Sequence, residues 1–345
     1  MKNQLKRTSI YLLIVIKILF YTVICSEVAH AQTQTSGFGL ALDEDYFMKP
    51  FGLNDDRNYT LGFHFSIFNT KYNSFLKKTL ALREFEDNLL PAEASFDVVA
   101  FTPNNIKAEE IQYNDRPYSN VLFLSLKRHG LNKDGDTYFA KTLYVGVLGT
   151  RLAEYFQGAI HKVMNSPEPK GWRNQISDGG EPTILYTQKK MSLLVDQQKF
   201  QLNHGYTYNL FYVTGASYNL GARCGLFNKE SWLTDMSGFI GSVTSRFNKM
   251  TQKKSREIYV YANLNTNLNV YNSSLHGQFR DTRYRIPYAK TGFVTLDTSL
   301  GVGVTFNRTT FSIYHKLRSP EIWDTNYRYW HNWIGISLIH QNKSN

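Results

Sequence analysis

The chain has 345 residues, a formal net charge of +11 at pH 7 and 15% aromatic residues, yet its mean hydropathy is −0.38. Beyond the N-terminal region, no segment has the roughly 18 consecutive apolar residues that a spanning helix needs, which excludes a bundle of transmembrane helices. A chain that is rich in aromatic residues but polar on average is typical of a secreted β protein or of a membrane β-barrel.

The first 31 residues have the pattern of a secretory signal peptide. They begin with three basic residues, continue with an apolar run and end with small residues at Ala29 and Ala31. This order of a basic start, an apolar core and small residues before a cleavage point predicts export. Lys17 interrupts the apolar run, which argues against a membrane anchor. We therefore expect one mature domain over 32–345.

The charge and the cysteine content limit the class of the mature protein. A net charge of +8 remains once the four basic residues and the one acidic residue of the first 31 are removed. In an exported protein this charge favours anionic lipid or lipopolysaccharide as a partner over nucleic acid. Cys224 is the only cysteine after that segment, so the sequence predicts a fold without internal disulfides.

Alternation of apolar and polar residues with period two runs through most of the mature chain. The pattern predicts twelve strands, an even number as bacterial barrels require, and no linker or repeat divides them into separate domains. The predicted strands span 37–46, 58–69, 92–102, 118–129, 137–149, 182–195, 199–213, 215–227, 255–270, 293–306, 308–318 and 332–341.

A β-sandwich would also alternate, so other features are needed to choose between the two folds. The predicted strands are long, and their apolar faces are nearly free of charge. Aromatic residues gather near strand ends, as at Trp330 and Trp333. The chain lacks the terminal aromatic residue of many outer-membrane barrels, which counts against this choice. On balance the sequence predicts an all-β, transmembrane antiparallel barrel.

The first two predicted strands carry oxygen-bearing side chains on the parity expected to face the lumen. Asp43 and Asp45 share this parity on the first strand, and Thr60 and His64 share it on the second. Carboxylate and hydroxyl oxygens on neighbouring strands could bind a hard cation such as calcium. The simpler alternative is an ordinary polar lumen with buried acid–base pairs.

The segment 151–165 breaks the alternation. Its apolar residues recur at spacings of three and four, which predicts a short amphipathic helix, and Pro167 prevents its continuation. Gln157 and His161 are four residues apart and therefore lie on one face of that helix. A single histidine in such a position is more often structural than catalytic.

Four short motifs, in order along the mature chain, resemble the outer-membrane lipid A 3-O-deacylase family. An acidic element with a following phenylalanine, DEDYF, spans 43–47, and an element of the form D-R-x-Y-T-x-G spans 56–62. The helix contains AIH at 159–161, with Gln157 one turn earlier, and GWRNQI follows at 171–176.

The resemblance implies a twelve-stranded barrel that removes a 3-linked acyl chain from lipid A of lipopolysaccharide with calcium as cofactor. On this basis His161 is expected to be the general base, and Gln157 is expected to orient the histidine or the attacking water. Asp45, Glu44 and Thr60 are expected to hold calcium, which stabilises the oxyanion, and Lys107 to bind the phosphorylated headgroup. The family also implies a monomer in the outer membrane of a Gram-negative bacterium.

Three departures from the family pattern concern the site. Glu44 stands where asparagine is usual, which adds a negative charge near the expected metal. Its parity points to lipid, so the strand must end or bulge there if Glu44 is to join the site. Only Lys107 matches an expected pair of basic residues, and Pro169 replaces a tyrosine.

Other functions remain possible on the sequence alone. A non-catalytic porin or transporter barrel needs an open lumen and has no requirement for His161. An outer-membrane phospholipase A uses a serine directly after its histidine, whereas Lys162 follows His161 here. A soluble lectin-like β protein leaves the expected lipid-facing parities unexplained.

Overall fold

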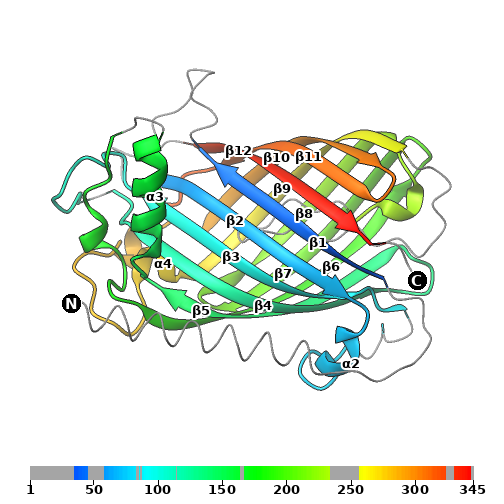
Figure 1. The fold of residues 1–345 in the computed structure, drawn as a ribbon, viewed down its shortest axis with the longest axis horizontal. Helices are drawn as coiled ribbons and strands as arrows, with labels where there is room; N and C mark the ends of the chain where they lie inside the picture. Colours follow the sequence, from blue (N-terminus) through cyan, green and yellow to red (C-terminus); the bar gives the residue numbers. More distant parts are fainter. Residues whose placement is uncertain are drawn as a thin grey trace. The chain divides into compact units, whose positions relative to one another are not determined.

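A computed structural model of the chain describes residues 35–45, 58–82, 85, 88–113, 115–163, 167–233, 256–323 and 330–342. The predicted signal peptide over 1–31 lies outside these residues. Within them, twelve antiparallel strands form a closed barrel in which each strand pairs with its neighbours in sequence and β1 pairs with β12 (Figure 1). The predicted fold class is confirmed.

The observed strand ends lie within two residues of the predicted ends. The strands are β1 (Ser36–Glu44), β2 (Asn58–Asn69), β3 (Ala92–Thr102), β4 (Ser119–Leu131), β5 (Thr137–Leu148), β6 (Glu181–Asp196), β7 (Phe200–Phe211), β8 (Val213–Leu226), β9 (Arg256–Asn272), β10 (Val294–Phe306), β11 (Thr309–Arg318) and β12 (His331–Gln341). The helices are α2 (Tyr72–Leu76), α3 (Leu152–Val163) and α4 (Ser273–His276), with short 3₁₀ turns η3 (Trp172–Asn174), η4 (Lys229–Ser231) and η5 (Tyr288–Lys290). No described helix has the length and apolar character needed to cross a membrane.

Alternation sets the two faces of the wall, as β10 illustrates. Leu300 and Val302 are exposed on the outside of the barrel, and Gly301 between them faces the lumen. Gly301 lies against the ring of Tyr261 on β9, so closely that an added Cβ would be 2.4 Å from that ring. Glycines at such positions make room for tyrosines inside the barrel. Exposed apolar side chains outside and large side chains inside are the arrangement expected of a lipid-facing wall.

The lumen contains buried acid–base pairs, as the simpler sequence alternative expected. His64 Nδ1 lies 2.7 Å from Asp97 Oδ1, and Lys127 Nζ lies 3.1 Å from Glu93 Oε2. Ser95 donates to Asp97 Oδ2 over 2.5 Å. His64 therefore belongs to a polar network that joins β2, β3 and β4.

One end of the lumen is filled by apolar and aromatic side chains. Tyr59 stacks on Trp333 with ring centroids 4.3 Å apart, and Phe123 meets Tyr212 edge to face at 5.3 Å. The same buried cluster includes Ile176, which comes from the connection that follows α3. This connection is therefore attached to the interior of the barrel as well as to its rim.

Long connections gather at the end of the barrel that carries α3 and α4 (Figure 1). Arg116 joins three of them: it is ion-paired to Glu321, donates to Ser274 Oγ over 2.9 Å and lies 3.7 Å from the ring centroid of Phe101. Burial alone would raise the pKa of Glu321, but Arg116 and Arg318 outweigh it and lower this pKa to about 2. Arg116 therefore links the connections around the barrel mouth.

We predict that the connections around the barrel mouth separate more readily when Arg116 or Glu321 loses its charge. Glu321 has a folded-state pKa of about 2 against an ordinary value of 4.5, so its stabilising effect is present above pH 4.5 and is lost as the pH falls towards 2. Gly292 donates its amide to the carbonyl of Glu321 over 2.8 Å, which makes hydrogen exchange of 288–293 a suitable measurement. Protection there should fall with pH over that range.

Arg116→Met should reduce the same protection at neutral pH by about a hundredfold, because the buried carboxylate of Glu321 loses the closer of its two cationic partners. Arg308→Met, in the turn between β10 and β11 at the other end of the barrel, is the matched control and should change nothing. Equal protection in the Arg116 variant and the wild type would show that the ion pair does not hold this connection.

Candidate active site between α3 and the barrel wall

Helix α3 packs against the outer side of the barrel wall. Ala153 is buried in a cluster with Tyr118, Trp172 and Ala100, against which Leu61 also packs. Ala100 and Leu61 are paired across β3 and β2 and alternate with lumen-facing residues, so they face outward. The predicted helix is confirmed at Leu152–Val163, and the structure attaches it to the outside of the barrel.

The connection from 167 to 180 holds α3 in this position. Gly171 lets the chain pass the ring of Tyr118, since an added Cβ would lie 2.5 Å from Tyr118 Cε2. Gln175 accepts a hydrogen bond from Asn120 over 2.6 Å and donates to the carbonyl of Thr150 over 3.2 Å. The motif GWRNQI is thus a structural element: its tryptophan packs on α3, and its glutamine anchors the connection to β4.

Gln157 is held in one orientation by Trp172. The indole Nε1 donates to Gln157 Oε1 over 2.8 Å, and only 6% of Gln157 is exposed. An indole N–H can only donate, so the contact fixes which end of the amide is the oxygen. The buried Nε2 has no hydrogen-bond partner among the described residues. The NH₂ group is thus available to donate to a bound molecule.

His161 lies one turn further along the same buried face and is 5% exposed. Its Nδ1 is 2.6 Å from the carbonyl oxygen of Pro167. A carbonyl only accepts, so Nδ1 carries a proton, and in the neutral ring Nε2 holds the lone pair. The carbonyl of Pro167 therefore fixes the tautomer of the histidine.

Thr60 does not face the lumen as its parity predicted. A bulge between Tyr59 and Leu61 shifts the register of β2 against β3. Tyr59 packs inside the barrel, whereas the hydroxyl of Thr60 lies 2.7 Å from that of Thr102, which alternates with lumen-facing Phe101. The bulge therefore moves Thr60 to the outer side, where α3 packs.

Asp45 and Glu44 lie at the end of β1 beside this bulge. The register pairs Glu44 with Leu61, so Asp45 follows next to Thr60. Asp45 is buried, and Glu44 is partly exposed on the outward parity. Because α3 also lies on the outer side, this parity brings Glu44 towards the site instead of excluding it.

The donors at this point are oxygens, which is the set that calcium prefers. Across the described part of the chain, no three His, Cys, Asp or Glu side chains gather as a metal centre. A calcium ion here would therefore need backbone carbonyls, water or substrate in addition to Asp45 and Thr60. The donors present are of the kind that calcium prefers, and calcium binding stays a prediction.

Lys107 is exposed on the connection between β3 and β4. Its neighbour Ile106 accepts hydrogen bonds from Tyr118 Oη over 3.1 Å and from the backbone of Lys170 over 2.9 Å. These bonds hold Lys107 next to the connection that carries Trp172. They also bring a second exposed lysine, Lys170, which the sequence motifs did not indicate.

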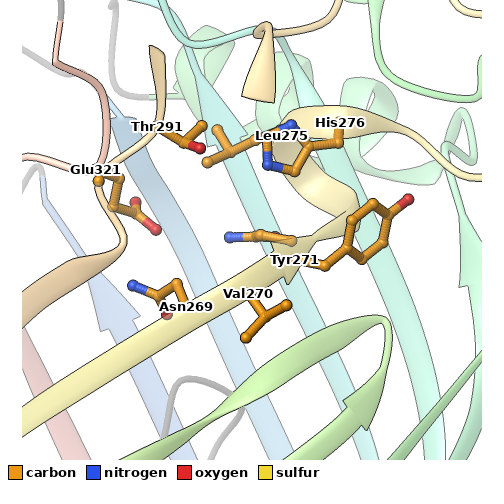
Figure 2. A pocket seen from close by; sticks show the side chains of 9 residues that line it. Asn269, Val270, Tyr271, Leu275, His276, Thr291 and Glu321 are labelled. Atoms are coloured by element: carbon orange, nitrogen blue, oxygen red, sulfur yellow. The ribbon is translucent and has the colours of Figure 1, made fainter. Parts of the chain in front are cut away.

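A hollow lies between β9, α4 and the connection after β11 (Figure 2). His276 and Thr291 line it, together with Glu321, whose carboxylate is already engaged by Arg116 and Arg318. Burial lowers the pKa of His276, whose Nδ1 donates to the carbonyl oxygen of Ile286 over 3.0 Å. These groups satisfy one another, and we assign no chemistry to this hollow.

Two contacts in the site could not be inferred from the motifs. The sequence indicated that Trp172 and Gln157 belong to the family pattern, but it gave no sign that they bond to each other. The partnership of Thr60 with Thr102 depends on the bulge between Tyr59 and Leu61, which the motifs did not indicate. Tyr59, Leu61 and Phe63 keep one apolar parity through this stretch, so the alternation gave no signal of the bulge.

We predict that enlarging Ala153 displaces α3 from the wall. Ala153→Leu adds volume to a closely packed contact and should cost about 1–3 kcal/mol, which should make Tyr155 and Phe156 more susceptible to chymotrypsin. Gly158→Ala is the control, because an added Cβ there meets nothing within 4 Å. It should protect the helix slightly, since alanine is the better helix former. Equal cleavage of both variants would contradict this packing.

Comparison with known proteins places the chain in a family. No curated protein sequence matches it. Among solved structures, LpxR from Salmonella typhimurium superimposes with a TM-score of 0.69 at 14% identity, covering 88% of this chain and 99% of that one. The β domain of the Bordetella autotransporter BrkA gives a TM-score of 0.41 at 6% identity, covering 90% and 99%. The latter is too distant to support any inference. A family profile matches residues 14–341, and the chain belongs to the family described as "Outer membrane protein LpxR".

Proposed function

We propose that the protein is an outer-membrane lipid A deacylase that hydrolyses the ester of a 3-linked acyl chain. The observation that carries this proposal is the burial of Gln157 and His161 side by side on the wall-facing side of α3, with each side chain oriented by its own partner. A histidine of fixed tautomer and an amide of fixed orientation are the groups that ester hydrolysis by activated water requires.

In the proposed reaction, His161 Nε2 takes a proton from a water molecule that attacks the ester carbonyl. The bond between the acyl carbon and the sugar oxygen then breaks, and the proton passes from His161 to that oxygen. The products are a fatty acid and a free sugar hydroxyl. The proton on Nδ1, held at Pro167, keeps Nε2 as the basic nitrogen throughout.

Gln157 supports the same reaction through its NH₂ group. Because Trp172 occupies Oε1, the NH₂ can donate to the attacking water or to the ester oxygen that gains negative charge. Trp172 is a positioning residue in this scheme, since it acts through Gln157. The exposed Lys107 and Lys170 provide positive charge for a phosphorylated headgroup.

Calcium, when bound, would supply a positive charge next to the ester carbonyl. Asp45 and Thr60 would hold it, and Glu44 lies close enough in sequence and on the correct side of β1 to contribute.

A porin or transporter has less support. It would need an open lumen, whereas aromatic and apolar side chains from β2, β4 and β12 pack together inside the end that carries α3. Such a function would also leave the pairing of Gln157 with Trp172 on the outer wall unexplained.

We predict that His161→Ala loses hydrolysis of lipid A while the barrel stays folded. Loss of a general base lowers the rate by about 10²–10⁴-fold. The measurement is mass spectrometry of lipid A incubated with protein in detergent, and heat-modifiable migration on a gel reports folding. His204→Ala is the matched control, because His204 lies on β7 and bonds to Tyr218 over 3.0 Å, outside the proposed active site. Normal hydrolysis by the His161 variant would refute the mechanism.

We also predict that the protein binds calcium through Asp45. Titration of the detergent-solubilised protein with calcium in a calorimeter should give binding that Asp45→Asn weakens at least tenfold, because one charged ligand becomes neutral. Asp134→Asn, in the exposed turn between β4 and β5, is the control and should bind as the wild type does. Unchanged binding in the Asp45 variant would place the ion elsewhere.

A further inference from the structure

The apolar side of α3 faces away from the barrel. The buried side carries Ala153, Gln157 and His161 at spacings of four. Tyr155 is 71% exposed and Phe156 is 46% exposed, and their rings meet edge to face at 5.9 Å. An amphipathic helix of a water-soluble protein has the opposite arrangement, with its apolar side buried. This helix needs an apolar environment on its outer side.

The outer wall beneath α3 continues this apolar surface. Leu61 packs in the cluster that holds Ala153, and Phe63 and Phe65 follow on the same outward parity of β2. Phe65 is exposed, and Phe63 meets Phe96 on β3 with ring centroids 6.2 Å apart. Figure 1 shows α3 beside the ends of β2 and β3. The exposed side of α3 is therefore continuous with the lipid-facing wall.

Charge along the helix agrees with a position at the edge of the lipid. Lys162 is exposed in the last turn of α3, beyond Tyr155, Phe156 and Ala159. A lysine at the end of an apolar stripe suits the anionic headgroups above the acyl chains, and tyrosine is enriched at that level of a membrane.

We propose that α3 is an interfacial helix whose exposed residues Tyr155, Phe156 and Ala159 contact the acyl chains of outer-leaflet lipid. The helix lies with its apolar side in lipid and its buried side towards the wall. A lipid that reaches the side of α3 facing β2 meets Gln157 and His161 without leaving the membrane. The contact with acyl chains stands without the proposed function, whereas the delivery of an ester to His161 rests on it.

Spin labels test the position of the helix. In a Cys224→Ser background, single cysteines replace Tyr155, Phe156, Lys162 or Phe65, and the labelled proteins are reconstituted in vesicles of phosphatidylcholine and phosphatidylglycerol. Labels at 155 and 156 should collide more often with oxygen than with a water-soluble nickel chelate, as the label at Phe65 does. The label at Lys162 should show the reverse. Labels at 155 and 156 that are as accessible to nickel as the label at 162 would overturn the proposal.

A second measurement separates this proposal from the proposed function. Tyr155→Ser with Phe156→Ser should raise KM for lipid A in vesicles about tenfold with little change in kcat, because the reacting groups stay in place. Tyr155→Phe with Phe156→Leu should restore the wild-type KM. If the labels lie in lipid but the wild type hydrolyses nothing, the proposed function fails and the lipid contact stands. If lipid A is hydrolysed while the labels lie in water, the interfacial helix fails alone.

Discussion

The contact of Trp172 with α3 is the constraint on which the site depends. The indole is fully buried in one cluster with Ala153 of α3 and Ala100 of β3. Its N–H then fixes the amide of Gln157. Since His161 follows Gln157 by one turn, the position of the histidine is set by the same contact. A single buried side chain thus determines where the helix stands and how its polar groups are directed.

The wall could be predicted from the sequence because its signal repeats. Alternation in segments such as Leu296–Phe306 is long enough to fix both the element and its two faces, and pairing between neighbours in sequence follows from short turns. The helix was also predictable, because its period differs from that of every segment around it. The local spacing of apolar residues determines whether a segment is a strand or a helix, so each prediction needed only a few consecutive residues.

The site was predictable only in part, because it depends on contacts between distant segments. Gln157 and His161 lie on one face of a helix, and spacing alone indicated this. Spacing did not indicate whether that face points towards the barrel. The apolar residues of α3 suggest burial of the opposite side, yet Tyr155 and Phe156 are exposed and the polar pair is covered. Contact with Trp172, fifteen residues after Gln157 in the sequence, covers the polar side of the helix.

The bulge at Thr60 shows how a β wall can acquire a working surface. In a regular strand, successive side chains point to opposite faces of the sheet, so the face of any residue follows from its position in the sequence. The bulge adds one residue to the strand, so that Thr60 and Leu61 both face the outside although they are adjacent, while Tyr59 faces the interior. The sheet keeps its closure and its hydrogen bonds on either side. In barrels whose alternation is otherwise regular, β-bulges are therefore places where functional residues can be sought.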